Sequence, residues 1–307
     1  MTDGTRIHGV LSPVVTPFDA ALRPDSARLV KHCQWLLSND VGLAVFGTNS
    51  EANSLSLNEK LGLLDALADA GIPGARMMPG TGACALSDAV ELTKKAVQVG
   101  AGGVLMLPPF YYKGVSDEGL YRSFAETIER VGDDRLRVYL YHIPQVSNVP
   151  ISLDLIARLL KDFPGIIAGV KDSSGNWGNT NAMLEQFQPQ GFDVFPGSET
   201  FLLPALRGGG AGCISATANV NPAAMAKLNT TWEADDADAQ QAALDAVRDI
   251  FQYYVMIPAL KAAVAHYGAD AEWSRLRPPL VELSTSEQTD LVKNLDAAGF
   301  TMPGLAG

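Results

Sequence analysis

Short apolar runs alternate with longer amphipathic stretches over the first 230 residues of the chain. The runs are continuously apolar, as in parallel strands buried on both faces, while the stretches between them have apolar positions at helical spacing. The expected strands cover residues 10–16, 43–47, 75–80, 103–107, 137–142, 166–171, 193–196 and 212–216, and the expected helices 26–38, 57–70, 86–99, 117–130, 152–161, 180–187, 200–207 and 222–232. Eight β-α units in one uninterrupted series predict a closed (β/α)₈ TIM barrel, an α/β fold, rather than an open sheet.

Strand signals stop after about residue 234, and the remaining chain has helical patterns. These helices are expected over residues 235–265, 279–284 and 287–298. We therefore divide the 307 residues into a barrel catalytic domain, 1–233, and a C-terminal helical appendage, 234–307. No linker rich in Gly, Ser or Pro separates them, so we expect the appendage to pack on the barrel rather than to fold alone.

Composition narrows the possible partners. Hydrophobic residues make up 47% of the chain, but aromatic residues only 7%, so aliphatic side chains must fill the core. The net charge of −11 argues against nucleic acid or an anionic membrane as the main partner, although a locally positive site can still bind an anionic substrate. The amino terminus does not resemble a signal peptide, and no run of 18 apolar residues offers a membrane span. We expect a soluble, cytoplasmic enzyme.

The sequence contains little that indicates a metal-binding or nucleotide-binding site. The three cysteines and four histidines are scattered without the spacing of a metal or disulfide framework. The run Gly208–Gly212, before Cys213-Ile214-Ser215, permits close ligand approach, but no acidic partner or following helix completes a nucleotide-binding motif. It is equally compatible with a turn entering the last strand. No P-loop or nucleophile elbow is present.

Barrel enzymes carry catalytic groups at the carboxyl ends of their strands, and Lys171 closes one such apolar run, GIIAGVK. Burial disfavours the ammonium form of a lysine, and a neutral amine can add to a carbonyl to form an imine. The alternative is a lysine that reaches solvent or pairs with Asp172.

Two further strand ends offer polar groups. Tyr139 and Tyr141, in VYLYHIP, point the same way along a strand, and one at the barrel mouth could carry a proton. Otherwise both fill the barrel with their hydroxyls satisfied. The turn Gly47-Thr48-Asn49-Ser50-Glu51 could hold a carboxylate with its amides and hydroxyls, or could simply cap the next helix.

Taken in order, six segments resemble the dihydrodipicolinate synthase / N-acetylneuraminate lyase family: PVVTPF, GTNSE, PPFYYKG with DEGLY, YHIP, GVKDSSGN and GAGCISATANVNP. The resemblance extends from about Val10 to the end of the chain. It implies that Lys171 forms an imine with pyruvate or a similar 2-oxo acid, and that Tyr141, hydrogen-bonded to Thr48, moves protons. It also implies that no metal or organic cofactor is needed.

The same resemblance implies the remaining site residues. Tyr111 would complete the proton relay, reaching into a neighbouring subunit of a homotetramer built as a dimer of dimers. The substrate-binding residues it implies are Gly47, Thr48 and Asn49 at the carboxylate, Ile214 over the pyruvate moiety, and Ser198, Glu199, Ser215 and His142 around the rest of the substrate.

Departures from the family pattern bear on the substrate. Val146 lies near the place where dihydrodipicolinate synthases have a carboxylate-binding arginine, which disfavours that activity. His142 replaces a common asparagine, and Ser50 replaces a glycine. Asn49 is similar to the residue in 2-keto-3-deoxy-acid and 4-hydroxy-2-oxoglutarate aldolases, whereas Ser198-Glu199 keeps half of the Asp-Glu pair of sialic acid lyases.

We therefore expect an aldolase that cleaves a 2-oxo-4-hydroxy acid, such as a 2-keto-3-deoxy sugar acid, to pyruvate and an aldehyde. A dehydratase of keto-deoxy sugar acids would use the same imine to expel water, and free pyruvate among the products separates the two. A non-catalytic barrel that binds 2-oxo acids is the third hypothesis. The presence of both an amine and a proton relay argues against it.

Overall fold

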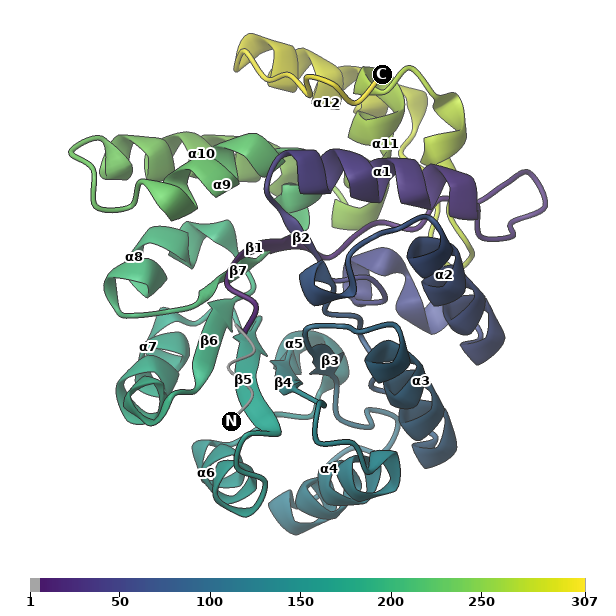
Figure 1. Ribbon diagram of the computed structural model, residues 1–307. Helices are drawn as coiled ribbons and strands as arrows, with labels where there is room; N and C mark the ends of the chain where they lie inside the picture. Colours follow the sequence, from purple (N-terminus) through teal and green to yellow (C-terminus); the bar gives the residue numbers. More distant parts are fainter. Residues whose placement is uncertain (1–5, 307) are drawn as a thin grey trace.

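The computed structural model describes residues 6–306, and in it a ring of strands is surrounded by helices (Figure 1). All the strands that pair are parallel, and they form two sheets, one in the order β2-β1-β7 and the other in the order β3-β4-β5-β6. The strands are β1 Gly9–Ser12, β2 Gly42–Leu43, β3 Val104–Met106, β4 Val138–His142, β5 Ile167–Asp172, β6 Asp193–Pro196 and β7 Gly212–Ile214. The predicted TIM-barrel fold is confirmed.

Single contacts join the two sheets into a ring. Parallel bridges pair Leu43 with Met77 and Gly80 with Leu105, so residues 77–80 occupy the place between β2 and β3. On the opposite side, the Ala211 N–H donates to the Val194 carbonyl at 3.0 Å. The strand expected over residues 75–80 is thus reduced to isolated bridges. A 3₁₀ turn over Gly74–Arg76 takes up its first residues, and Pro79 has no N–H to donate.

Side-chain alternation along β4 separates the barrel interior from the helix-facing side. Val138 and Leu140 pack toward the helices, whereas Tyr139 fills the barrel interior, where its hydroxyl donates to Asp193 at 3.0 Å. A Cβ on Gly103 would lie 2.5 Å from the Tyr139 ring, so glycine is needed there to admit it. Because period-two alternation gives Tyr141 the same direction, its ring enters the barrel mouth.

The helices between the strands follow the predicted pattern closely, and α1 has the bounds expected. They are α1 Ser26–Ser38, α2 Leu57–Asp69, α3 Leu86–Gln98, α4 Asp117–Val131, α6 Leu153–Asp162, α7 Trp177–Phe187, α8 Leu202–Arg207 and α9 Pro222–Thr230, with a short α5, Pro144–Ser147, directly after β4.

The C-terminal helices lie along one side of the ring, beyond α1 and α9 (Figure 1). They are α10 Ala237–Gln252, α11 Met256–Tyr267 and α12 Thr285–Ala297. The single helix expected over residues 235–265 is interrupted before Pro258, because proline is tolerated in a helix only within the first turn. The helix expected over residues 279–284 is also wrong: this segment is irregular, with Leu283 buried and Val281 exposed. The boundary at residue 233/234 stays a prediction.

One buried histidine is expected to make the fold sensitive to acid. His32 on α1 is packed between Trp35 and Trp273, and neither ring nitrogen has a hydrogen-bond partner within residues 6–306. Burial lowers the pKa of His32 to about 4 from its usual 6.5. Below pH 6.5 the unfolded chain therefore binds more protons at this residue than the folded protein does. We expect this residue to reduce the free energy of unfolding by about 3 kcal/mol as the pH falls from 6.5 to 4.

Urea unfolding at a series of pH values checks this expectation. In a His32→Leu variant the proton-binding group is gone, so the difference in stability between variant and wild type should change across this pH interval. A difference that stays constant with pH would contradict the assignment.

Candidate active site

A cavity of about 400 Å³ lies at the carboxyl ends of the strands and is termed here the strand-end cavity. The lining residues come from the turn after β2, from β4 and β5, from the segments after β6 and β7, and from α10 and α11. They are Thr48, Asn49, Tyr141, Ile143, Gln145, Lys171, Asp172, Ser173, Gly175, Gly197, Ser198, Thr200, Phe201, Ala216, Arg248, Gln252 and Met256. The sequence-predicted Lys171, Tyr141, Thr48, Asn49 and Ser198 are thus brought together.

The amine, the phenol and the hydroxyl form a continuous group. Tyr141 and Lys171 are partners in the β4–β5 register, and the Lys171 Nζ lies 4.4 Å from the centre of the Tyr141 ring. The Tyr141 hydroxyl is 3.1 Å from the Thr48 Oγ1, the hydrogen bond that the family resemblance implied. Lys171 is only 3% exposed and Tyr141 only 4%. A buried amine beside a phenol that has a hydrogen-bonded neighbour can support imine chemistry with proton transfer.

The turn that carries Thr48 and Asn49 is held rigidly. Residues Thr48–Ser50 form one 3₁₀ turn, in which the Ser50 Oγ accepts from the Gly47 N–H at 3.2 Å. The Thr16 hydroxyl donates to the Ser50 carbonyl at 2.7 Å. Gly47 is buried and does not line the cavity. Its N–H already donates to Ser50, so it is not free to bind a ligand. The lining residues Thr48 and Asn49 remain available to a carboxylate.

Glu199 and Ser215 form a network at the edge of the cavity rather than part of its lining. Glu199 is 1% exposed, and its carboxylate accepts from the hydroxyls of Ser215 and Thr217. The Arg248 Nη1 lies 3.2 Å from the Glu199 Oε2. Because the Glu199 carboxylate is occupied by these three donors, it orients its neighbours. Of the Ser198-Glu199 pair, only Ser198 lines the cavity.

His142 and Ile214 lie away from the strand-end cavity. His142 follows Tyr141 and so points to the opposite face of β4, where its Nδ1 accepts from the Ile151 N–H at 3.0 Å and its Nε2 lies 4.0 Å from Asp172. Burial lowers the pKa of His142. Ile214 packs with Phe195 in the barrel interior. We therefore expect no direct substrate contact from His142, and none from Ile214 without a change in its packing.

Tyr111 is far more exposed than the other predicted catalytic residues. Its side chain is 75% exposed in the segment before α4, and it packs edge-to-face against Tyr112, with 5.4 Å between ring centres. It does not line the strand-end cavity of its own chain. A role in catalysis therefore requires the neighbouring subunit that the resemblance implied.

Several lining residues were not predicted from the sequence, and three of them, Arg248, Gln252 and Met256, belong to the appendage, where no site residue was expected. A signal was present in α10, where Gln241, Arg248 and Gln252 share one helix face at spacings of seven and four. Gln241 donates to the Glu199 carbonyl at 2.9 Å, which directs this face toward the barrel. The appendage is therefore a wall of the site.

A buried ion pair joins the appendage to the turn after β2. The Lys261 Nζ of α11 lies 2.8 Å from the Glu51 Oε1 and 2.9 Å from the Thr16 carbonyl, and both charged side chains are fully buried. The Arg277 N–H donates to the other Glu51 oxygen at 3.1 Å. Burial lowers the pKa of Lys261, while Glu51 opposes that shift. Since Glu51 ends the turn that carries Thr48 and Asn49, α11 helps to fix the side of the cavity to which these two residues belong.

Replacing Lys261 with methionine is expected to destabilise the protein by about 3–5 kcal/mol, because it leaves the Glu51 carboxylate buried without a counter-ion. Urea unfolding measures the loss. The matched control is Arg76→Met, which removes the surface partner of Asp40, 3.0 Å away, and should cost about 1 kcal/mol or less. A double variant, Glu51→Gln with Lys261→Met, should recover part of the loss. Equal losses in Lys261→Met and the surface control would contradict this assignment.

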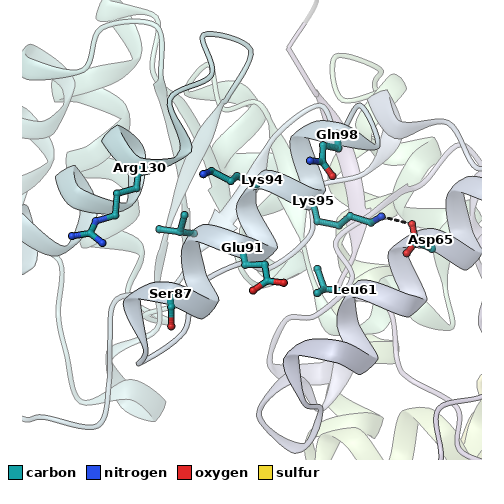
Figure 2. Close-up of a pocket in the computed structure, with 9 residues that line it drawn as sticks. Leu61, Asp65, Ser87, Glu91, Lys94, Lys95, Gln98 and Arg130 are labelled. Carbon is teal, nitrogen blue, oxygen red and sulfur yellow. Dashed lines mark hydrogen bonds and ion pairs between the residues drawn. The ribbon is translucent and has the colours of Figure 1, made fainter.

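A larger hollow, about 590 Å³, lies on the outer wall between α2 and α3 and reaches Arg130 of α4 (Figure 2). Its charged side chains include Glu91 and Lys95, and Lys95 bonds to Asp65 across it. None of the predicted site residues lines this hollow. It lies on the helix surface rather than at the strand ends, so we place the chemistry in the strand-end cavity.

Two features are absent from residues 6–306. In that part of the chain no group of three or more His, Cys, Asp or Glu side chains is arranged to hold a metal ion. None of its helices has the length and apolar character needed to cross a membrane.

Comparison with known proteins gives the family. The model of the dihydrodipicolinate synthetase family matches residues 6–298. A 4-hydroxy-tetrahydrodipicolinate synthase from Methanococcoides burtonii is 34% identical over 296 residues, covering 94% of this chain and 96% of the relative. The dihydrodipicolinate synthase of Agrobacterium tumefaciens has a crystal structure that superposes with a TM-score of 0.87 at 30% identity, covering 95% of this chain and 99% of that one.

The fold and these relatives define an aldolase-type lyase on a TIM barrel. The chain belongs to the dihydrodipicolinate synthetase family. Its fold is also that of a 2-keto-3-deoxygluconate aldolase variant from Sulfolobus solfataricus, with a TM-score of 0.84 at 24% identity over 94% of this chain and 95% of the other. The family resemblance and the enzyme class expected from the sequence are therefore confirmed.

Proposed function

We propose that the protein cleaves a 2-oxo-4-hydroxy acid to pyruvate and an aldehyde through an imine on Lys171. The observation that carries this proposal is the grouping of the buried Lys171 amine, the Tyr141 phenol and the Thr48 hydroxyl in one cavity at the strand ends. Thr48 and Asn49 lie where they can bind the carboxylate next to the reacting carbonyl.

The proposed reaction begins when the Lys171 amine adds to C2 of the substrate. The carbinolamine hydroxyl takes a proton from Tyr141 and leaves as water, which produces a protonated imine. The Tyr141 oxygen then takes the proton of the C4 hydroxyl, and the C3–C4 bond breaks with its electron pair passing to the imine. The aldehyde leaves, and C3 of the enamine takes the proton back from Tyr141. Water then adds to the imine and returns a proton to Tyr141, which releases pyruvate and the free amine. The imine is the electron acceptor, so the proposed chemistry uses no metal or organic cofactor.

A second candidate is synthesis of 4-hydroxy-tetrahydrodipicolinate, the activity for which the M. burtonii relative is named. The same imine of pyruvate would begin that reaction. The position expected to hold an arginine has Val146, which lies in α5, is 57% exposed and does not line the strand-end cavity. We therefore favour the cleavage reaction, with loss of water from a keto-deoxy sugar acid as its closest variant.

The exposed Tyr111 supports a further part of the proposal. A tyrosine that cannot reach the cavity of its own chain would complete the relay of another copy, and we infer a homotetramer on this basis and from the family resemblance. The cytoplasmic location remains a prediction.

Borohydride trapping tests the proposed function. The intact mass of the protein should rise by one reduced pyruvate after incubation with pyruvate and borohydride, and peptide mapping should place the adduct on Lys171. A folded sample that gives no adduct, beside an aldolase that labels normally, would exclude pyruvate as the imine partner. Free pyruvate in the products of a keto-deoxy sugar acid then separates cleavage from dehydration.

A further inference from the structure

Arg248 of α10 is the second cation of the strand-end cavity, and its contacts leave part of the guanidinium unused. Its side chain is 16% exposed. The Nη1 carries both contacts, 3.2 Å to the Glu199 Oε2 and 3.3 Å to the Ser215 Oγ. Within residues 6–306 the buried Nε has no hydrogen-bond acceptor. Because this Nε is shielded from solvent, the Nη2, which makes no hydrogen bond within the same residues, is the nitrogen left to donate to a ligand in the cavity, and a charge-assisted hydrogen bond from it is a strong one.

The neighbours of Arg248 hold it in one orientation. Glu199 also accepts from the hydroxyls of Ser215 and Thr217, so its carboxylate is fully engaged. Gln241 lies on the same face of α10 as Arg248, seven residues earlier. It donates to the Glu199 carbonyl and accepts from the Leu203 N–H at 3.0 Å. A guanidinium fixed in this way loses little conformational freedom when it binds an anion.

Two cations line the cavity, so a ligand with two negative groups can contact one with each group. The Nη1 of Arg248 is already paired with Glu199 at the cavity edge, and its Nη2 is left for the ligand. Among residues 6–306, Lys171 and Arg248 are the cations that line the cavity, and Asp172 is the one acidic lining residue. The Asp172 carboxylate accepts from the side chains of Ser174, Asn179 and Thr180, and so is occupied. The reacting end of the ligand is held by groups from β2, β4 and β5, whereas Arg248 contacts groups that follow β6 and β7. The two cations are therefore held by different segments of the barrel.

We propose that the substrate carries a second carboxylate, at the end remote from the 2-oxo acid, and that the Nη2 of Arg248 binds it. This inference rests on the proposed function and specifies the missing half of the substrate: the aldehyde that is released bears a carboxylate. Ser198 and Thr200, which also line this side of the cavity, would contact the carbons between the two ends. Arg248 thus supplies a carboxylate contact that Val146 cannot make.

The condensation reaction gives a direct test, because the enamine of pyruvate adds to an aldehyde in the reverse of the proposed cleavage. Two pairs of aldehydes differ only by a carboxylate in place of a hydroxymethyl group: glyoxylate with glycolaldehyde, and succinic semialdehyde with 4-hydroxybutanal. We expect kcat/KM of the wild type to be greater for the carboxylate in at least one pair, by about 10- to 100-fold. Preference for the neutral aldehyde in both pairs would overturn the inference without any variant.

Arg248→Gln should remove this preference by raising KM for the carboxylate aldehyde, with little change for the neutral one. Arg248→Lys keeps the charge beside Glu199 and should recover part of the preference. The matched control is Arg207→Gln, which removes a surface arginine paired with Asp238 at 2.9 Å and should leave both rates unchanged. Equal losses for both aldehydes in Arg248→Gln would assign the arginine a purely structural role and overturn the inference.

Borohydride trapping of pyruvate separates this result from failure of the proposed function. If the Arg248 variants still form the adduct, the imine chemistry is intact, and the aldehyde comparison reports only on the part of the cavity that Arg248 lines. If the wild type forms no adduct, the proposed function fails, and the inference that rests on it fails as well.

Discussion

Replacing Lys171 with alanine is expected to reduce turnover by on the order of 10⁴-fold or more, because it removes the amine that is proposed to form the imine. The side chain is 3% exposed and faces the cavity, and the aromatic ring of Tyr141, 4.4 Å away, cannot replace it as a nucleophile. Arginine keeps the positive charge of lysine but has no primary amine, so Lys171→Arg should be equally inactive.

Release of pyruvate from a keto-deoxy sugar acid measures this loss, and borohydride trapping should give no adduct in either variant. The control is Lys161→Ala, which removes an exposed lysine at the end of α6 and should leave both results unchanged. Thermal unfolding confirms that the variants are folded. Substantial turnover in folded Lys171→Ala would mean that the reaction does not pass through an imine at this residue.

The second large effect is expected from Tyr141→Phe, which should lower kcat by about 10²–10⁴-fold with a small change in KM. The phenylalanine keeps the ring that packs beside Lys171 but removes the hydroxyl that lies 3.1 Å from Thr48. Loss of the proton carrier slows both the departure of water and the cleavage of the C3–C4 bond, whereas ground-state contacts with the 2-oxo acid remain.

Tyr139→Phe is the matched control, two residues away on the same face of β4. Its hydroxyl contacts Asp193 inside the barrel rather than the cavity, and burial raises the pKa of Tyr139 well above its usual value. Removing this hydroxyl should cost about 1 kcal/mol of stability and change kcat by a small factor. Equal kcat values for Tyr141→Phe and wild type would exclude the proton-transfer role.

The parts of the fold that follow from local pattern could be predicted from the sequence. The bounds of α1 were expected as found, and Lys171 and Tyr141 could be placed side by side because barrel strands end at one face. The alternation of side chains also places His142 on the opposite side from Tyr141. That consequence of the same rule was not drawn from the sequence, where the family resemblance suggested a substrate contact instead.

What the sequence could not give depends on long-range packing. Residues 77–80 carry an apolar pattern, but whether they form a continuous strand depends on the neighbours on both sides and on Pro79. Arg248 is an ordinary polar position of an amphipathic helix until α10 is placed against the segments that follow β6 and β7. The spacing along α10 shows which residues share a face, but not what that face contacts.

The division of the strand-end cavity between strands and appendage has a consequence for how such enzymes diversify. The groups proposed to make and break the carbon–carbon bond stand on β4, β5 and the turn after β2, whereas Arg248 and Gln252 stand on α10, outside the barrel. If Arg248 binds the aldehyde half as proposed, substitutions in α10 should exchange one aldehyde for another while leaving the proposed bond-breaking groups untouched. A library confined to the inward face of this helix is a rational starting point for making new 2-oxo acids from pyruvate.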